Sequence, residues 1–320
     1  MVSSLILWVG IFIVSLAVLA KSSGYFTDSA EVIGKFFRLP PFIIGVTIVA
    51  IGTSLPELVS SLFAVFNGVS EVVVANVIGS NITNIFLILG ITAIVSKKIK
   101  ISHDLVRVDL PLLVGSAFLF AFAIWDGVFS LFEAILFILG LIIYLVYTMS
   151  TQRKHEDVSA EKKIAKDLTK EKLSFRTWLI FAISSIFLFI GAKYTIDSVI
   201  HLSEVLNVGT EIIAISAVAL GTSLPELMVS INAARKGKAE IAVGNILGSN
   251  IFNTFAVMGI PALFGLLIIP QSILSFGLPL MLAATLLYFF ITQDNEITKW
   301  EGWMLIMFYV FFIFKLFNLA

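Results

Sequence analysis

The chain of 320 residues has no cysteine and carries few charges. Without cysteine, disulfides, thiolate metal sites and cysteine nucleophiles are excluded. Charged residues make up 13% of the chain, whereas about a quarter is normal for a soluble domain. The 21 Lys and Arg balance the 21 Asp and Glu, so the net charge is zero and neither nucleic acid nor an acidic partner is indicated.

In place of charge the chain has long apolar stretches, and hydrophobic residues make up 59% of it. A membrane helix needs about 20 mainly apolar residues. We therefore predict an all-α integral membrane protein with ten transmembrane helices. The predicted spans are residues 3–20, 42–66, 71–95, 106–124, 127–148, 176–197, 211–234, 239–264, 269–291 and 299–318.

The distribution of cations predicts the orientation in the membrane. Cytoplasmic connections of membrane proteins are enriched in Lys and Arg. Every Lys and Arg except Lys193 and Lys315 lies in or beside the alternate connections that begin after the first span. The only long connection, the Lys- and Glu-rich segment 149–175, is one of them. The pattern predicts a multi-pass protein of the plasma or inner membrane, with both termini outside and this linker in the cytoplasm.

The sequence also contains an internal repeat. The heptapeptide GTSLPEL occurs at 52–58 and at 221–227, and GSNI recurs at the same offset of 169 residues. Each copy contains five predicted spans, an odd number, so the two copies must cross the membrane in opposite directions. We predict a first repeat at 1–148 and an inverted second repeat at 176–320. Inverted repeats in transporters place the substrate site near the bilayer midplane, between the two halves.

Each heptapeptide places a proline inside a predicted span. Pro56 has no N–H to donate, and its ring clashes with the carbonyl of Gly52, four residues back. Pro225 stands in the same relation to Gly221. A carbonyl released in this way still needs a partner, because no water is available in the hydrocarbon. A bound cation can be that partner.

Glu57 and Glu226, one in each heptapeptide, are the strongest functional candidates. A charge at the centre of a membrane helix costs at least about 2.5 kcal/mol on insertion scales. No Lys or Arg lies in the core of any predicted span, so no protein counter-ion is evident. We expect the positive charge to arrive as the substrate; the alternative is a pair of protonated, structural carboxylates.

Helical spacing surrounds the glutamates with further oxygen donors. Residues at i, i+3, i+4 and i+7 share one face of a helix. This spacing is met by Ala50, Thr53, Ser54 and Glu57, and again by Ala219, Thr222, Ser223 and Glu226. Steps of four residues join Asn76, Ser80 and Asn84, and likewise Asn245, Ser249 and Asn253. A donor set made only of oxygen suits hard cations such as Ca²⁺ or Na⁺. Small polar residues also serve as packing contacts between membrane helices, which is the alternative for Ser80 and Ser249.

The paired G-T-S-L-P-E motif, followed in each half by G-S-N-x-x-N, resembles the calcium/cation antiporter superfamily, and in particular its prokaryotic sodium/calcium exchanger branch. The resemblance covers nearly the whole chain. It implies ten helices in two inverted halves of five and the exchange of Ca²⁺ against Na⁺. At the matching positions, it implies that Glu57 and Glu226 ligate both ions and that Thr53 and Thr222 contribute oxygens to the calcium site.

The resemblance also implies roles for the remaining polar positions. Ala50 with Ser80, and Ala219 with Ser249, would complete flanking sodium sites, and Asn84 and Asn253 would border the middle of the cluster. Some relatives, including potassium-dependent exchangers, carry Asp where this chain has Asn253, which disfavours potassium dependence. The acidic motif of proton/calcium exchangers, G-N-A-x-E, is found in neither half.

We therefore expect a secondary antiporter that works by alternating access, with Ca²⁺ and Na⁺ as its ligands in the lipid bilayer, no cofactor and no evident protein partner. Three alternatives stay open. One is a proton- or sodium-coupled exchanger of another divalent cation. The second is an intramembrane acid/base enzyme with paired glutamates, which the near-identical halves disfavour. The third is a passive channel, which would not show exchange of one ion for another.

Overall fold

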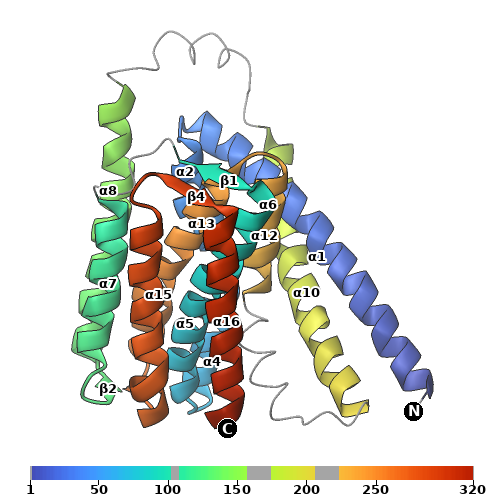
Figure 1. Ribbon diagram of the computed structural model, residues 1–320, viewed down its shortest axis with the longest axis vertical. Helices are drawn as coiled ribbons and strands as arrows, with labels where there is room; N and C mark the ends of the chain where they lie inside the picture. The colour runs from blue at the N-terminus through green and yellow to red at the C-terminus, as the bar shows by residue number, and fades with distance from the viewer. Residues whose placement is uncertain (1, 102–107, 157–173, 206–222, 320) are drawn as a thin grey trace.

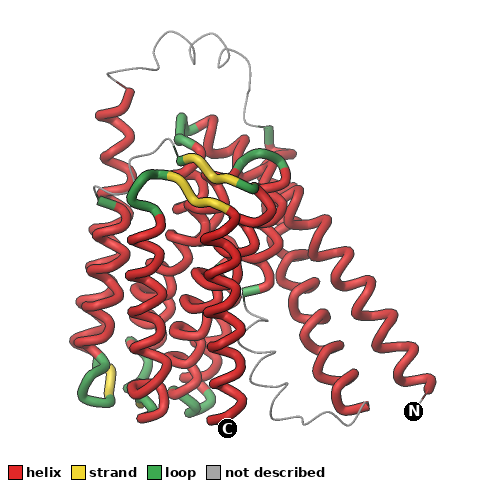
Figure 2. Tube along the Cα trace, viewed as in Figure 1, coloured by secondary structure: helices red, strands yellow, loops and turns green. Residues whose placement is uncertain are grey.

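The computed structural model describes residues 2–101, 108–156, 174–205 and 223–319, and nearly all of this part is helical (Figure 1, Figure 2). Segments labelled η are π-helical turns. The first half contains α1 (Val2–Phe36), α2 (Pro41–Ile44), η1 (Gly45–Val49), α3 (Ala50–Thr53), α4 (Leu55–Phe66), α5 (Glu71–Thr83), η2 (Asn84–Leu89), α6 (Gly90–Ser96), β1 (Lys98–Lys100), α7 (Asp109–Ala123), β2 (Val128–Phe129) and α8 (Leu131–Glu156).

The second half follows a similar order. It contains α10 (Phe175–Val205), α12 (Leu224–Arg235), α13 (Ala239–Phe252), η3 (Asn253–Val257), α14 (Met258–Ala262), β3 (Leu267–Ile268), η4 (Ile273–Gly277), α15 (Leu278–Ile291), β4 (Glu296–Thr298) and α16 (Lys299–Leu319). Two π-helical turns, η2 and η3, begin at the repeat-related residues Asn84 and Asn253.

Seven described helical segments are long and apolar enough to cross a membrane, and α7 is apolar but shorter. The seven are Leu5–Phe36, Pro41–Phe66, Glu71–Ser96, Leu131–Thr148, Phe175–Thr195, Ala239–Ala262 and Ile273–Ile291. Each overlaps a predicted span, so the predicted class of helical membrane protein is confirmed. α16 coincides with the predicted span 299–318, and α12 covers the described part of the predicted span 211–234.

Two helices of the first half extend well beyond the predicted ends of their spans, and in the second half α10 runs past residue 197 to Val205. The first span was predicted to end at Ala20, but α1 continues to Phe36. Its polar residues do not break it, because the hydroxyls of Ser22 and Thr27 donate hydrogen bonds to carbonyls one turn back, at 2.7 and 2.8 Å. Similarly, α8 runs past residue 148 to Glu156. In both cases the apolar sequence stops before the helix does.

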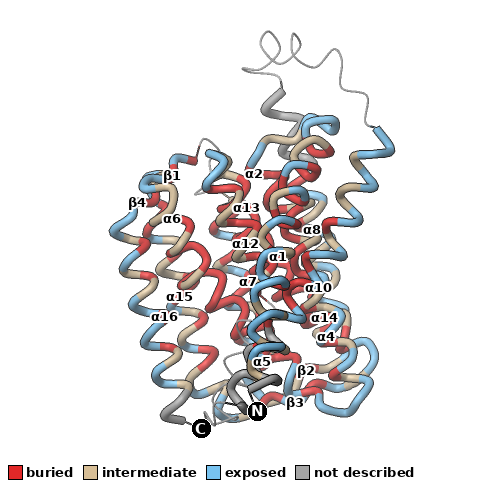
Figure 3. Tube along the Cα trace, turned by 90° about the vertical axis from the view of Figure 1, so that its right-hand side faces the viewer, coloured by how far each residue is buried: buried red, intermediate tan, exposed pale blue. Residues whose placement is uncertain are grey.

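α13 occupies the centre of the molecule. Every residue in the apolar window of the segment Ala239–Ala262 is buried, and buried residues are concentrated along the axis of the bundle (Figure 3). The helices α1 and α10 pack along each other as a pair at one side of this bundle (Figure 1). Phe26 of α1 stacks on Phe181 of α10, with ring centroids 4.9 Å apart, and lies against Gly52. The pair therefore covers the side of the bundle where the first GTSLPEL segment lies.

Two short antiparallel β-ladders join the halves of the chain. β1 pairs with β4, with Ile99 opposite Ile297, and β2 pairs with β3, with Phe129 opposite Leu267. The two ladders lie at opposite ends of the bundle (Figure 3). Each ladder thus takes one strand from each half of the chain. In sequence order, the strands β1 and β2 lie at opposite ends of the bundle, and so do β3 and β4.

Ion pairs tie α1 to the connection between α12 and α13. Lys236 Nζ lies 2.6 Å from Asp28 Oδ2, and Lys238 Nζ lies 2.9 Å from Asp28 Oδ1. Lys238 also pairs with Glu31, and Glu31 pairs with Lys35 at 2.9 Å. Burial lowers the pKa of Lys238, but the hydrogen bonds to Glu31 and Asp28 outweigh it, so this pKa lies above its ordinary value. These contacts give Asp28 a structural role.

Glycines allow η1 and α13 to cross with their backbones in contact. A Cβ on Gly244 would lie 2.3 Å from the carbonyl oxygen of Phe42, and one on Gly248 would lie 2.3 Å from that of Val46. A Cβ on Gly45 would lie 2.3 Å from the carbonyl oxygen of Ile241. Small residues at such crossings let membrane helices approach closely. Gly248, the first residue of the second GSNI motif, therefore allows α13 to lie this close to η1.

We predict that Gly244→Ala lowers the apparent melting temperature in detergent, because its methyl group meets a backbone oxygen that cannot move aside. Overpacking of this kind costs about 1–3 kcal/mol. Gly115→Ala in α7 is the matched control, since a Cβ there meets no atom within 4 Å. Alanine also favours the helix by about 1 kcal/mol over glycine, so the control should melt at the same or a higher temperature. Equal melting temperatures for the two variants would contradict the close crossing.

Candidate functional site

The two GTSLPEL segments have nearly the same backbone geometry at the serine two residues before the proline. Ser54 and Ser223 leave helical geometry, with φ and ψ of −88° and 4° and of −86° and 3°. α4 and α12 begin at the next residue, with a proline in the first turn. Because Pro56 has no N–H, the carbonyl of Gly52 cannot accept the hydrogen bond that a continuous helix would give it. The predicted interruption at proline is therefore present in the first copy, between α3 and α4; residues 206–222, which precede Ser223 in the second copy, lie outside the described residues.

Each break brings a buried glutamate into the first turn of the helix that follows. Glu57 and Glu226 are each only 1% exposed. The N-terminus of a helix carries a partial positive charge, which stabilises a nearby carboxylate by about 0.3–1 kcal/mol and up to about 2 kcal/mol when partly buried. This is smaller than the several kcal/mol needed to bury an ion without a counter-charge. The helix ends therefore offset only part of the cost of burying these carboxylates in ionised form.

A direct contact joins the two motif copies. Ser54, at the break of the first copy, donates a hydrogen bond to Oε1 of Glu226 in the second copy at 3.0 Å. Oε2 of Glu226 is buried and has no hydrogen-bond partner among the described residues. Since the contact connects segments that lie far apart in the chain, the two copies of the heptapeptide contribute to one site.

Two asparagines brace the helices that carry the glutamates. Asn245 accepts a hydrogen bond from Thr53 Oγ1 at 3.1 Å and donates one to Ser230 Oγ at 3.0 Å. Its repeat partner Asn76 donates to Ser61 Oγ at 3.2 Å. Ser61 and Ser230 are themselves related by the repeat offset. These asparagines use their amide groups to link α5 to α4 and α13 to α12, so they position the site.

A second asparagine pair joins the halves at the centre of the bundle. Asn253 donates a hydrogen bond to Asn81 Oδ1 at 3.2 Å, and Asn81 donates to Thr254 Oγ1 at 3.3 Å. Asn81 was not among the predicted ligands, and its bridging role was missed. The repeat of GSNI marks Asn81 as a candidate, because Asn81 lies within it. The repeat does not show which helix Asn81 faces, so the bridge could not be predicted.

Several buried oxygens near these contacts have no protein partner among the described residues. They are Glu226 Oε2, Asn84 Oδ1, Asn253 Oδ1, Ser223 Oγ and Ser249 Oγ. Buried polar atoms without a hydrogen bond are rare in native proteins and require a water, an ion or another explanation. Asn84 and Asn253 also begin the π-helical turns η2 and η3, and such turns occur frequently at functional sites.

Ten of the twelve predicted ligand residues fall in the described part of the chain, and each is at most 1% exposed. They are Ala50, Thr53, Ser54, Glu57, Ser80, Asn84, Ser223, Glu226, Ser249 and Asn253. Ala219 and Thr222 lie outside the described residues. The hydroxyl of Ser80 donates to Asn76 Oδ1 at 3.4 Å, while that of Ser249 has no such partner in the described ranges.

The charge of the site is set by two carboxylates. Among the described residues, no group of three or more His, Asp or Glu side chains gathers where it could hold a metal ion. A cation bound here would therefore rely on Glu57, Glu226 and neutral oxygens from hydroxyl, amide and backbone groups. Ca²⁺ takes about 6 to 8 oxygen ligands and accepts this mixture, and the donors are too hard for metals that prefer thiolate or imidazole.

Comparison with known proteins identifies a family that matches both halves of the chain. The family described as sodium/calcium exchanger protein matches residues 7–150 and 176–318. The chain is 36% identical to the sodium/calcium exchanger MaX1 of Methanosarcina acetivorans over 96% of this chain and 97% of that protein. It is 33% identical to the inner membrane protein YrbG of Escherichia coli over 81% of this chain and 80% of that protein.

The fold is similar to that of solved exchanger structures. A structure of the sodium-calcium exchanger NCX_Mj, soaked with Na⁺ and Sr²⁺, superposes with a TM-score of 0.82 at 29% sequence identity. The superposition covers 96% of this chain and 98% of that one. The likeness therefore includes both halves of the molecule and the segments that carry the glutamates.

We predict that Asn245→Ala destabilises the protein, because Thr53 and Ser230 both lose a buried partner. Each unsatisfied buried group costs about 1–3 kcal/mol, which should appear as a lower apparent melting temperature in detergent. Asn67→Ala removes an amide that is exposed and bonds only to the carbonyl of Phe63, at 2.7 Å, so this control should change little. If both variants melt alike, Asn245 does not brace the two helices.

Proposed function

Because the chain belongs to the sodium/calcium exchanger protein family, we propose that it exchanges Ca²⁺ for Na⁺ across a cell membrane by alternating access. The observation that carries the proposal is the burial of Glu57 and Glu226 in the first turns of two repeat-related helices, with Ser54 of one copy bonded to Glu226 of the other. The family is one of transporters and not of enzymes, and its substrates are cations in a membrane setting.

The proposed ligand set follows the repeat. Glu57 and Glu226 bind both ions, and the other ligands supply neutral oxygens around them. Support comes from the buried oxygens of Asn84, Asn253 and Ser249, which have no hydrogen-bond partner within the described ranges. The proposed ligands are Glu57, Glu226, Thr53, Thr222, Asn84, Asn253, Ser80, Ser249, Ala50, Ala219, Ser54 and Ser223, of which Ala219 and Thr222 are included through their repeat partners.

Electrostatics explains why such a site exchanges ions and does not leak. One Ca²⁺ or two Na⁺ neutralise the two carboxylates, and a third Na⁺ leaves the loaded site with one positive charge. The empty site keeps two bare carboxylates, whose burial without a counter-charge costs several kcal/mol each. Reorientation of the empty site is therefore suppressed, and the protein changes sides only when an ion is bound.

The membrane potential favours calcium extrusion coupled to more than two Na⁺. Moving Ca²⁺ outward against about 100 mV costs roughly 4.6 kcal/mol, from about 2.3 kcal/mol per charge. Two Na⁺ entering the cell only cancel this cost, whereas a third adds a net driving charge. We propose that the protein extrudes Ca²⁺ and admits more than two Na⁺ for each Ca²⁺.

Alternating access requires a central site that can open to either side of the membrane in turn, and two inverted halves make this possible. We propose ten transmembrane helices in two inverted repeats, residues 1–148 and 176–320, joined by a cytoplasmic linker, 149–175. This is supported by the matching starts of α4 and α12, the paired π-helical turns and the β-ladders at opposite ends of the bundle. With cations concentrated in alternate connections, both termini are placed outside.

We predict that purified protein in liposomes takes up Ca²⁺ when an outward Na⁺ gradient is imposed. Coupling to three Na⁺ moves net charge, so clamping the membrane potential should change the initial rate. Gradients of K⁺ and of pH, each imposed separately, should drive no uptake. Uptake driven by the pH gradient and indifferent to Na⁺ would contradict the proposal and favour proton-coupled exchange of a divalent cation.

We predict that Glu57→Gln and Glu226→Gln each reduce sodium-driven Ca²⁺ uptake at least about thirtyfold. Truncating one partner of a buried charge pair costs about 2–5 kcal/mol, and about 1.4 kcal/mol corresponds to a factor of ten. Glu71→Gln is the matched control, because Glu71 also lies in the first turn of a helix but is exposed. All three variants should elute as monodisperse, folded protein. Normal uptake by either site variant would exclude that glutamate as a ligand.

A further inference from the structure

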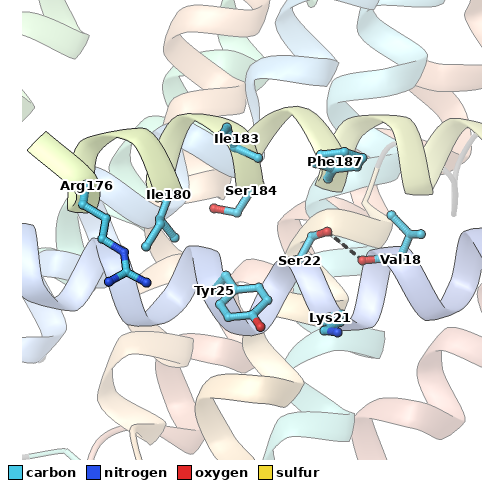
Figure 4. A pocket seen from close by; sticks show the side chains of 9 residues that line it. All are labelled: Val18, Lys21, Ser22, Tyr25, Arg176, Ile180, Ile183, Ser184 and Phe187. Atoms are coloured by element: carbon cyan, nitrogen blue, oxygen red, sulfur yellow. Dashed lines mark hydrogen bonds between the residues drawn. The ribbon is translucent and has the colours of Figure 1, made fainter.

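The contact between Asn81 and Asn253 differs from the usual arrangement of buried polar side chains in this bundle. Many buried hydroxyls bond back to a carbonyl of their own helix. Ser22, for example, donates to the carbonyl of Val18 at 2.7 Å in the groove between α1 and α10 (Figure 4). Asn81 of α5 instead forms its side-chain hydrogen bonds with residues of the second half of the chain.

The neighbours of Asn81 determine which end of its amide faces Asn253. Its Nδ2 lies 3.3 Å from Thr254 Oγ1, 3.5 Å from the carbonyl oxygen of Asn250 and 3.8 Å from Met281 Sδ. A carbonyl oxygen and a thioether sulfur can only accept hydrogen bonds, so they require the amino end of the amide on this side. The orientation of an amide follows from such partners. The oxygen of Asn81 therefore faces Asn253.

This acceptor turns the amide of Asn253 in one direction. Asn253 donates through Nδ2 to Asn81 Oδ1 at 3.2 Å. Its own Oδ1 then lies on the opposite branch, where it is buried and has no hydrogen-bond partner among the described residues. Asn253 begins η3, which packs against α4, the helix whose first turn carries Glu57. Ca²⁺ is bound by amide oxygens, whereas an amide N–H can only donate. The end of Asn253 that is left available is thus the end that can coordinate a cation.

The repeat-related pair lacks this contact. Asn250 corresponds to Asn81, and Asn84 to Asn253, at the offset of 169 residues. Nδ2 of Asn250 donates to the carbonyl of Ile246 in its own helix at 2.6 Å. Neither amide atom of Asn84 has a partner within the described ranges. The orientation of Asn253 therefore comes from Asn81 and its neighbours, and not from the repeated motif as such.

We propose that Asn81 is a positioning residue of the ion site, which holds the amide oxygen of Asn253 toward the bound Ca²⁺ and the amino group away from it. This role rests on the proposed function, because it takes Asn253 as a ligand. Without an acceptor at position 81, the amide of Asn253 is free to turn its amino group to the ion. Groups that orient a ligand in this way change metal affinity by about 10- to 100-fold.

The test is a calorimetric titration of the purified, full-length protein with Ca²⁺ in sodium-free buffer, which measures binding without transport. Asn81→Leu removes the acceptor and should weaken Ca²⁺ binding by at least about tenfold. In the background of Asn253→Ala, which leaves no amide to orient, Asn81→Leu should cause no further loss. Such non-additivity is expected when one residue acts through another. A full second loss in that background would overturn the proposal, because Asn81 would then act through the fold alone.

Asn81→Asp gives a second measurement, which also decides the question if Asn81→Leu does not fold. It keeps an acceptor opposite Asn253 but adds a charge, so the quantity to compare is the loss that Asn253→Ala causes in each background. This loss should be as large in the Asn81→Asp background as in the wild-type background. If Asn253→Ala caused no loss there, an acceptor at position 81 would not be what orients Asn253, and the proposal would be wrong.

Two control variants remove a buried hydroxyl and leave the acceptor at Asn81 in place. Thr254→Val removes one partner of the Asn81 amino group, which keeps the carbonyl of Asn250. Ser22→Ala removes the hydroxyl in the groove between α1 and α10 (Figure 4). Both should bind Ca²⁺ as the wild type does, and a loss as large as that of Asn81→Leu would overturn the proposal.

The titration also separates this role from the proposed function. Wild-type protein that binds no Ca²⁺ would overturn both. Tight binding by the wild type together with equally tight binding by Asn81→Leu would overturn the role of Asn81 and leave the proposed function standing.

Discussion

Two carboxylates in the interior of a membrane-type helical bundle constrain the structure around them. Burying an ion without a counter-charge costs several kcal/mol, and a favourable helix end returns at most about 2 kcal/mol of this. Glu57 and Glu226 lie at such ends because α4 and α12 begin directly after the non-helical residues Ser54 and Ser223, with a proline in the first turn. Each glutamate thus depends on the helix start that precedes it, and under the proposed function a cation offsets the remaining cost of its burial.

The polar residues around the glutamates fall into two groups: those that bond to neighbouring helices, and those whose oxygens have no protein partner among the described residues. Asn76 and Asn245 bond to serines on neighbouring helices, and Asn245 also holds Thr53. Asn84 keeps its side-chain oxygen buried without such a bond among the described residues. Asparagine therefore has two roles along this segment. Asn76 braces α5 against α4, and Asn84, two turns later at the start of η2, keeps an oxygen that is available to a ligand.

Sequence predicted the parts of the fold that follow from composition and repetition. Apolar stretches located the helices, and the GTSLPEL pair located the breaks and both glutamates. Bracing by Asn245 and the bridge through Asn81 were missed, because they depend on which helices cross, and spacing along one helix does not contain that information. The extension of α1 to Phe36 was missed for a different reason. Serine and threonine end an apolar window, yet their hydroxyls bond back to the same helix.

The two halves are alike at the site and differ at the surface, which has a consequence for their energetics. Asp28 is bonded to Lys236 and Lys238, whereas the positions related to these lysines by the repeat hold the uncharged residues Asn67 and Val69. α1 is therefore tied to the bundle by ion pairs that its repeat counterpart cannot form in the same way. Partly exposed ion pairs contribute about 0–1 kcal/mol each. Under the proposed alternating access, a bias of this size would change the balance between two conformations severalfold without locking either, and the free energy of ion binding would still decide which conformation is populated.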